Sequence, residues 1–227
     1  MTGAAQLALA FPQRAAFGRA DFLVAPANAD AVAWIDSWPG WPARALVVHG
    51  PAGSGKSHLA QSWRLRASAD ELDPAALEPA TLAERTAGAA AFVVEDVDRS
   101  PPDERGWFHF LNLLGERGQF ALFTARTAPI RWSVGLPDLA SRLRALPSAA
   151  IQAPDDALIE AVLVKQLADR QVRVAPETVR YVVARIERSL EAAGRVVAAL
   201  DAAALAAQKP LTVPLARDVL RDVGFDT

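Results

Sequence analysis

Apolar runs of strand length alternate with stretches of helical periodicity through the first two thirds of the chain. The uninterrupted runs are typical of buried parallel strands, and apolar residues at helical spacing lie before and between them. We expect strands at 44–49, 90–94 and 119–123 and helices at 28–38, 56–65 and 104–115. In the last helix Trp107, Phe108, Leu111 and Leu114 are predicted to be core residues. The alternation predicts a three-layer α/β domain with a parallel sheet and right-handed crossovers.

From Asp155 the pattern becomes purely helical. Asp155-Asp156, Pro176 and Pro214 are residues that commonly open helices. We expect helices from 155 to about 167, at 176–186, at 189–207 and from 214 to about 220. The chain is therefore predicted to divide into an N-terminal segment (1–14), an α/β domain (15–152) and a small all-helical domain (153–227).

Composition narrows the class of protein. With 52% apolar and 22% charged residues among 227, the chain is expected to be globular, and its apolar runs are too short for a membrane span. The absence of cysteine excludes disulfides and thiolate metal sites, and His49, His58 and His109 are too scattered for a zinc centre. No signal peptide is recognisable, so a cytoplasmic location is expected. A net charge of -2 with dispersed basic residues does not favour direct DNA binding.

The segment Gly50–Ser57 has the pattern G-x-x-x-x-G-K-S between a predicted strand and a predicted helix. Glycines at these positions allow successive backbone N–H groups to point at phosphate oxygens. Lys56 would reach the β- and γ-phosphates, and Ser57 would offer its hydroxyl to Mg²⁺. We therefore expect ADP or ATP with Mg²⁺ as cofactors, bound by Gly50, Gly53, Ser54, Gly55, Lys56, Ser57 and His58.

A phosphate-binding loop of this kind, a P-loop, needs carboxylates on a neighbouring strand to hold Mg²⁺ and to position the attacking water. Glu95-Asp96 directly follows a predicted strand and fits this role, although such a pair alone is more often a solvated strand end. Thr124, at the end of the next strand, would place a hydroxyl near the γ-phosphate or the water. An ordinary turn residue is the alternative for Thr124. The expected metal ligands are Ser57, Glu95 and Asp96.

Three segments resemble the DnaA-type AAA+ ATPases, and among them most closely the Hda family, whose members inactivate the replication initiator DnaA. Gly55–Leu59 resembles Walker A, Val93–Asp96 resembles Walker B, and Gly135–Leu143 is similar to the Hda segment that carries an arginine finger. The resemblance implies an AAA+ P-loop domain with a C-terminal helical lid, and it assigns the finger to Arg142. Taken alone, Arg142 would be a surface or interface ion-pair residue.

The N-terminal stretch Gln6–Phe11 resembles the peptide by which Hda binds the DNA polymerase III sliding clamp, its β subunit. The resemblance assigns clamp contacts to Gln6, Leu7, Leu9 and Phe11. A strand or tail packed on the domain is the alternative. The implied partners are the clamp and DnaA, and a homodimer stays open. The tail 208–215 also resembles Hda, and no DnaA-like helix-turn-helix domain is expected.

Three departures from the family pattern bear on the site. The Walker B pair is Glu-Asp where relatives usually begin with Asp, which leaves open which carboxylate faces Mg²⁺. The lid position of the sensor 2 arginine is Glu191, with Arg188 and Arg195 expected on the same helix face as replacements. The clamp peptide ends in Ala-Phe where Leu is more usual.

Two functions follow from these residues. The first is a nucleotide-binding regulator of replication initiation that binds the clamp and stimulates hydrolysis of DnaA-bound ATP, itself a weak ATPase at most. The alternative is a self-contained AAA+ ATPase that acts as a loader or remodeller. A nucleotide-dependent adaptor without a role in hydrolysis is a third interpretation.

Overall fold

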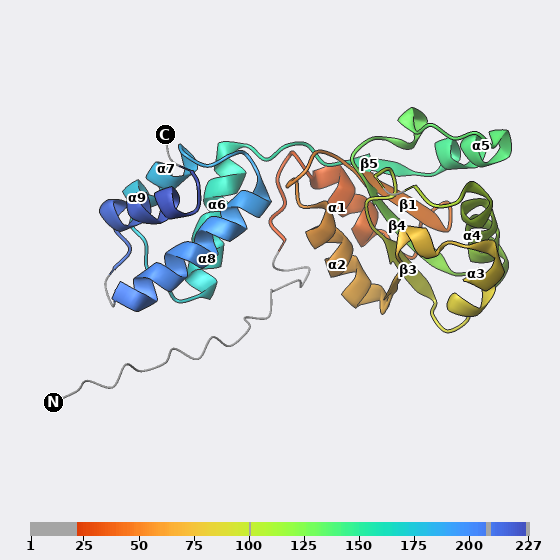
Figure 1. Cartoon of the computed structure of the whole chain (residues 1–227), viewed down its shortest axis with the longest axis horizontal. Coiled ribbons are helices and arrows are strands. Elements are labelled where there is room, and N and C mark those ends of the chain that lie inside the picture. Colours follow the sequence, from red (N-terminus) through yellow and green to blue (C-terminus); the bar gives the residue numbers. More distant parts are fainter. Residues whose placement is uncertain (1–21, 100, 208–209, 226–227) are drawn as a thin grey trace.

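A five-stranded parallel sheet forms the centre of the α/β domain (Figure 1). The computed structural model describes residues 22–99, 101–207 and 210–225. The strand order is β2-β3-β4-β1-β5, and every pairing is parallel. The strands are β1 (Ala45–His49), β2 (Asp70–Glu71), β3 (Ala91–Val94), β4 (Phe120–Ala125) and β5 (Ser148–Ala150).

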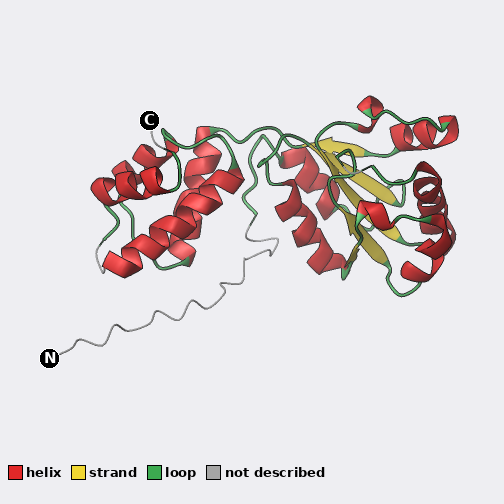
Figure 2. Ribbon diagram, viewed as in Figure 1, coloured by secondary structure: helices red, strands yellow, loops and turns green. Residues whose placement is uncertain are grey.

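Helices cover both faces of this sheet (Figure 2). The helices of the α/β domain are α1 (Ala29–Asp36), α2 (Lys56–Ala67), α3 (Pro79–Arg85), α4 (Glu104–Arg117) and α5 (Pro137–Ala145), with short 3-10 turns at Pro74–Ala76 and Pro129–Arg131.

Alternate residues of β1, β3 and β4 enter two separate hydrophobic cores. Leu46, Val48 and Leu122 pack on the side of α1 and α2. Val47 and Phe123, the next residues along, pack on the side of α3, α4 and α5. Because both faces are buried, each central strand is apolar throughout, which is why the sequence reads as continuous apolar runs. The predicted three-layer α/β fold is confirmed.

The remaining helices form a second body, called the helical body below, beside the α/β domain (Figure 1). They are α6 (Asp156–Asp169), α7 (Pro176–Val183), α8 (Leu190–Ala207) and α9 (Val213–Asp222). Ile159, Val182, Val197 and Leu220, one from each helix, belong to one hydrophobic core of this body. The predicted boundary at 152/153 falls between the last strand and α6, and this division of the chain stays a proposal.

Four elements of the α/β domain were not anticipated from the pattern. Strands β2 and β5 have two and three residues, too short to carry a recognisable apolar run. Helices α3 and α5 have seven and nine residues and begin at prolines. In these short elements tertiary contacts, rather than periodicity, decide the conformation. The four predicted core residues of α4 do pack in the core, Trp107 and Leu114 buried and Phe108 and Leu111 half-buried.

Several element ends also differ from those expected. Strand β4 continues to Ala125 instead of ending at Thr124, because its pairing with β1 extends to His49. Helix α7 ends at Val183, three residues before the predicted Ile186.

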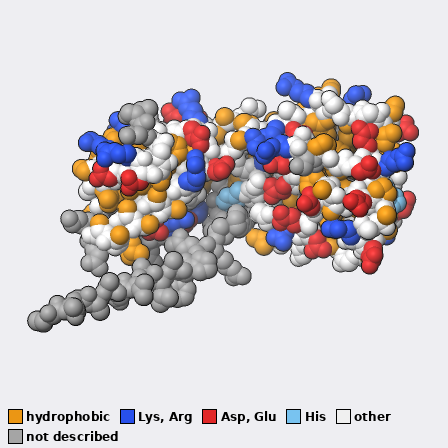
Figure 3. All heavy atoms as spheres, in the orientation of Figure 1, with side chains coloured by type: hydrophobic (Ala, Val, Ile, Leu, Met, Phe, Trp, Pro, Cys, Tyr) orange, Lys and Arg blue, Asp and Glu red, His pale blue; other side chains and the backbone are white. Residues whose placement is uncertain are grey.

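In the described parts of the chain, no helix combines the length and apolar character that a membrane crossing requires. Acidic and basic side chains are interspersed over the face of the molecule in Figure 3.

Candidate nucleotide site

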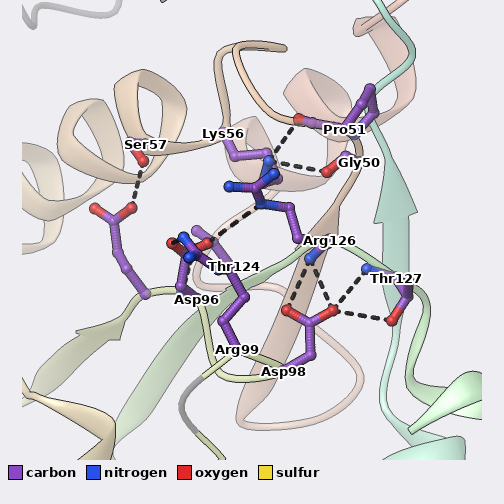
Figure 4. Close-up of polar contacts among 11 residues, drawn as sticks. Gly50, Pro51, Lys56, Ser57, Asp96, Asp98, Arg99, Thr124, Arg126 and Thr127 are labelled. Carbon is purple, nitrogen blue, oxygen red and sulfur yellow. Dashed lines mark hydrogen bonds and ion pairs between the residues drawn. The ribbon is translucent and has the colours of Figure 1, made fainter.

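The P-loop follows β1 and leads directly into α2. Gly55 is the N-cap of α2 in the left-handed region, with φ of 100°, a conformation that glycine adopts without steric cost. Lys56 is the first helical residue and only 6% exposed. Its Nζ donates to the carbonyl oxygens of Gly50 and Pro51 at 2.9 and 2.8 Å (Figure 4). The ammonium is therefore held inside the curl of the loop, where the motif requires it.

The carboxyl ends of β1, β3 and β4 lie side by side because β4 pairs with both of the other strands. Ser57 follows β1 and Glu95 follows β3, and the Ser57 hydroxyl donates to Glu95 Oε2. These two residues are 38 positions apart in the sequence. A hydroxyl and a carboxylate in contact beside a P-loop are a suitable pair of oxygen ligands for Mg²⁺.

Asp96 points to a different set of partners. Its Oδ2 lies 3.6 Å from Arg99 Nη1 and its Oδ1 lies 4.0 Å from Arg126 Nε (Figure 4). Its backbone is in the left-handed region, with φ of 52°, which turns the chain at the end of β3. Of the two carboxylates whose roles were open, Glu95 is the one beside Ser57, and Asp96 lies among arginines.

Thr124 is buried, at 1% exposure, within β4 rather than after it. Its Oγ1 accepts a hydrogen bond of 3.0 Å from the Asp96 N–H. The contact fixes the turn that carries the carboxylate. The hydroxyl thus acts on the site through Asp96, and the predicted proximity of Thr124 to a phosphate stays a prediction.

Asp98 holds the turn after β4, a role that none of the recognised motifs indicates. Its carboxylate accepts from the N–H groups of Arg126 and Thr127 and from the Thr127 hydroxyl, at 2.9–3.0 Å. A third acid shortly after Glu95-Asp96 was visible in the sequence. The sequence does not indicate which residues this acid binds, since they lie 28 and 29 residues further along the chain.

Cationic neighbours set the electrostatics of the loop. Burial lowers the pKa of Lys56, and the nearby Arg126 lowers it further, whereas the carboxylates of Asp96, Asp98 and Glu95 raise it. Two cations therefore face a cluster of acids at the mouth of the P-loop. Such an arrangement attracts an anion together with a divalent cation.

The helical body contacts the P-loop directly. Leu190 N, at the start of α8, donates to Gly53 O at 2.7 Å, and a Cβ added at Gly53 would lie 2.0 Å from Ser189 Oγ. The Leu190 side chain lies over Gly55, where an added Cβ would approach its Cδ1 to 3.1 Å. These glycines thus leave room for the side chains of Ser189 and Leu190. No pattern in the sequence pointed to Ser189 or Leu190.

The expectation that Arg188 shares a helix face with Glu191 is wrong, because α8 begins at Leu190 and Arg188 lies in the preceding loop. Glu191 is exposed in the first turn of α8. Arg188 makes two hydrogen bonds to the carboxylate of Asp156 in α6, at 2.9 and 3.3 Å. Arg195 pairs with Glu187 at 3.1 Å. Both arginines are therefore engaged within the helical body.

Arg142 lies on α5, exposed and away from these residues. Its Nη1 donates to Asn112 Oδ1, and its guanidinium lies 4.4 Å from the ring centroid of Phe108, both in α4. Helix α5 is at the end of the α/β domain opposite the helical body (Figure 1). The structure does not bring Arg142 together with the P-loop of its own chain.

The other predicted site residues are placed as follows. His58 is half-buried in α2 with its ring edge-on to Phe22, at 5.5 Å between centroids. Ser54 is buried within the loop, at 2% exposure. Gln6, Leu7, Leu9 and Phe11 lie outside the described residues.

Known structures share this architecture. Domain III from the Thermotoga maritima replication initiation protein DnaA is similar with a TM-score of 0.80 at 18% identity, over 93% of this chain and 98% of that one. AMPPCP-bound DnaA from Aquifex aeolicus has a TM-score of 0.67 at 15% identity, over 82% of this chain and 65% of that one. The Thermotoga maritima Holliday junction branch migration motor RuvB has a TM-score of 0.64 at 12% identity, over 81% of this chain and 63% of that one.

The fold is therefore that of the AAA+ proteins, with the arrangement of DnaA domain III. Residues 155–220, most of the helical body, match the family model described as Hda, lid domain. The helical body is thus similar to the Hda lid, and the fold of the chain is similar to that of DnaA domain III.

The contact between the P-loop and the lid makes Gly53 sensitive to substitution. We expect Gly53→Ala to lower the free energy of unfolding by at least about 1–2 kcal/mol, the cost of a left-handed alanine, before any clash with Ser189 is counted. Urea denaturation of the full chain measures this.

Gly88→Ala is the matched control, because an added Cβ there meets nothing within 4 Å. Adding Ser189→Gly to Gly53→Ala should recover only the part of the loss that arises from the clash. A Gly53→Ala variant as stable as the parent would contradict the packing described.

Proposed function

We propose that the chain is a nucleotide-binding regulator of replication initiation, which binds the sliding clamp and stimulates hydrolysis of ATP bound to DnaA. The single observation that carries the proposal is the position of Arg142, exposed on α5 and packed on α4 rather than on its own P-loop. The Hda-type lid supports the same assignment.

The residues present fit a bound nucleotide with Mg²⁺. The buried Lys56 ammonium is aimed into the loop. A glycine-rich loop of this kind can direct backbone N–H groups at phosphate oxygens. Ser57 and Glu95 would hold Mg²⁺, which neutralises charge on the phosphates when bound. The protein's own part is to orient the phosphates and to fix the lid against the loop.

Lys56→Ala should abolish nucleotide binding, because the P-loop ammonium is removed and the helix N-terminus alone binds phosphate weakly. Titration with a fluorescent ADP measures the affinity, and a parallel thermal melt checks that the variant folds. Unchanged affinity in a folded variant would remove the P-loop assignment.

An arginine finger must reach a phosphate of another molecule. A guanidinium is suited to this role because it is permanently charged and presents a planar fork of donors to phosphate oxygens. Asn112 and Phe108 hold the Arg142 side chain at the surface by one hydrogen bond and one ring contact. Both are weak enough to be exchanged for a phosphate of DnaA-bound ATP.

Arg142→Ala should leave the fold and the nucleotide affinity of this chain nearly unchanged, while DnaA-ATP hydrolysis falls by about a thousandfold or more. Arg142→Lys should recover little of it, since a point charge does not reproduce the fork of donors. The measurement is the ratio of ATP to ADP on DnaA over time, with clamp loaded on DNA.

Arg144→Ala is the control, since this arginine is exposed two residues further along α5. Parent-like stimulation by Arg142→Ala would contradict the mechanism. If Arg142→Ala instead lost its own nucleotide, the residue would act on its own site, and the self-contained ATPase would become the better assignment.

Clamp binding is proposed from the resemblance of Gln6–Phe11 to a clamp-binding peptide. In such peptides a few side chains that fill an apolar pocket carry most of the binding energy. Deleting residues 1–11, or changing Leu9 and Phe11 to Ala, should therefore release the protein from the clamp in pull-down experiments. Nucleotide affinity should not change. Retention on the clamp would return this segment to a structural role.

A further inference from the structure

Glu104, the first residue of α4, is hydrogen-bonded to the backbone just before α5. Its Oε1 accepts from the Gly135 N–H at 2.7 Å, and its Oε2 accepts from the Leu136 N–H at 2.8 Å. These N–H groups lie 31 and 32 positions further along the chain, and α4 and α5 lie side by side at one end of the α/β domain (Figure 1). None of the motifs recognised in the sequence includes Glu104.

The start of α5 depends on this carboxylate because α5 has no capping side chain of its own. Leu136 is its N-cap and makes no side-chain capping hydrogen bond, and Pro137, the first helical residue, has no N–H. A negative charge at this end also interacts favourably with the helix dipole. Hydrogen bonds to an ionised acceptor are stronger than those between neutral groups. The start of α5 is therefore anchored by a side chain of another helix.

Apolar contacts hold the rest of α5. Leu139 and Leu143 are buried in the core shared with α4. Such contacts are non-directional, so they keep the helix on the core without specifying its exact position along its own axis. A helix of nine residues is also too short to be stable in isolation. The hydrogen bonds from Glu104 are directional, and they fix the axial position of α5.

The position of Arg142 follows from this anchor. Arg142 lies about two turns of α5 beyond Leu136, and it meets Asn112, which lies about two turns of α4 beyond Glu104. The two helices therefore run in the same direction, and a shift of α5 along α4 would displace the guanidinium by the same amount. A group that must reach a reacting phosphate is sensitive to displacements of about 1 Å.

We propose that Glu104 is a positioning residue for Arg142. By binding the N–H groups of Gly135 and Leu136 it fixes the place of α5, and through α5 it fixes the place where the guanidinium is presented. The inference rests on the proposed function of Arg142 and adds to it the residue that sets the position of its helix. Glu104 acts through the backbone of α5, without a contact of its own to the nucleotide.

The test measures hydrolysis of DnaA-bound ATP against the concentration of the full chain, with clamp loaded on DNA. Glu104→Ala should lower the maximal rate by about tenfold or more, because displacement of a reacting group by about 1 Å can cost about a hundredfold. The concentration that gives the half-maximal rate and the chain's own affinity for ADP should be nearly unchanged. Glu104→Gln keeps one acceptor oxygen without the charge and should give a smaller loss of maximal rate.

Hydrogen exchange reports the contact without any partner. In Glu104→Ala the Gly135 and Leu136 amides should exchange faster than in the parent, because their acceptor has been removed. The amides of β1, which pair within the sheet, should keep their protection. Parent-like protection of Gly135 and Leu136 in this variant would contradict the anchoring role.

Asp155→Ala is the matched control. The Asp155 carboxylate also accepts a backbone N–H at the start of a helix, that of Leu158 at 2.8 Å, but this helix, α6, belongs to the helical body. The variant should lose about as much stability in a thermal melt and keep the parent rate. A parent-like maximal rate in every folded Glu104 variant, or an equal loss in Asp155→Ala, would overturn this inference alone. If Arg142→Ala also stimulated as the parent does, the proposed function would fail and the inference with it.

Discussion

The pairing of β4 with both β1 and β3 is the constraint on which the rest of the site depends. It brings the P-loop, the acidic turn after β3 and the turn after β4 to one edge of the sheet. In parallel α/β sheets, loops at the carboxyl ends of the strands form the binding crevice for the same geometric reason. Without this strand order Ser57 would not meet Glu95, and Thr124 would not hold the N–H of Asp96.

A second contact joins this edge to the lid. The hydrogen bond from Leu190 to Gly53 and the absence of a Cβ at Gly53 allow the start of α8 to lie on the P-loop. A shift of the P-loop backbone would therefore be transmitted to the lid through one short contact.

Arg126 and Arg142 lie in different parts of the α/β domain. Arg126 is held by Asp98 at the chain's own phosphate loop, whereas Arg142 is presented on α5 at the far end of the domain. The first lies beside the P-loop of this chain, and the second is the residue proposed to act on the nucleotide of another molecule. A substitution at one position therefore need not disturb the other.

The sequence by itself determined the local elements. Requirements of backbone conformation or burial that adjacent residues satisfy account for three features. These are the apolar runs of β1, β3 and β4, the glycines of the P-loop and the helix-opening residues of α6, α7 and α9.

The tertiary structure decided which distant side chains meet. Glu95 contacts Ser57 across 38 residues, Asp98 binds a turn 28 residues away and Arg188 pairs with Asp156 across 32. These contacts depend on strand order and on the packing of the lid against the loop. Neither has a periodicity along the chain, so no local pattern could have predicted them.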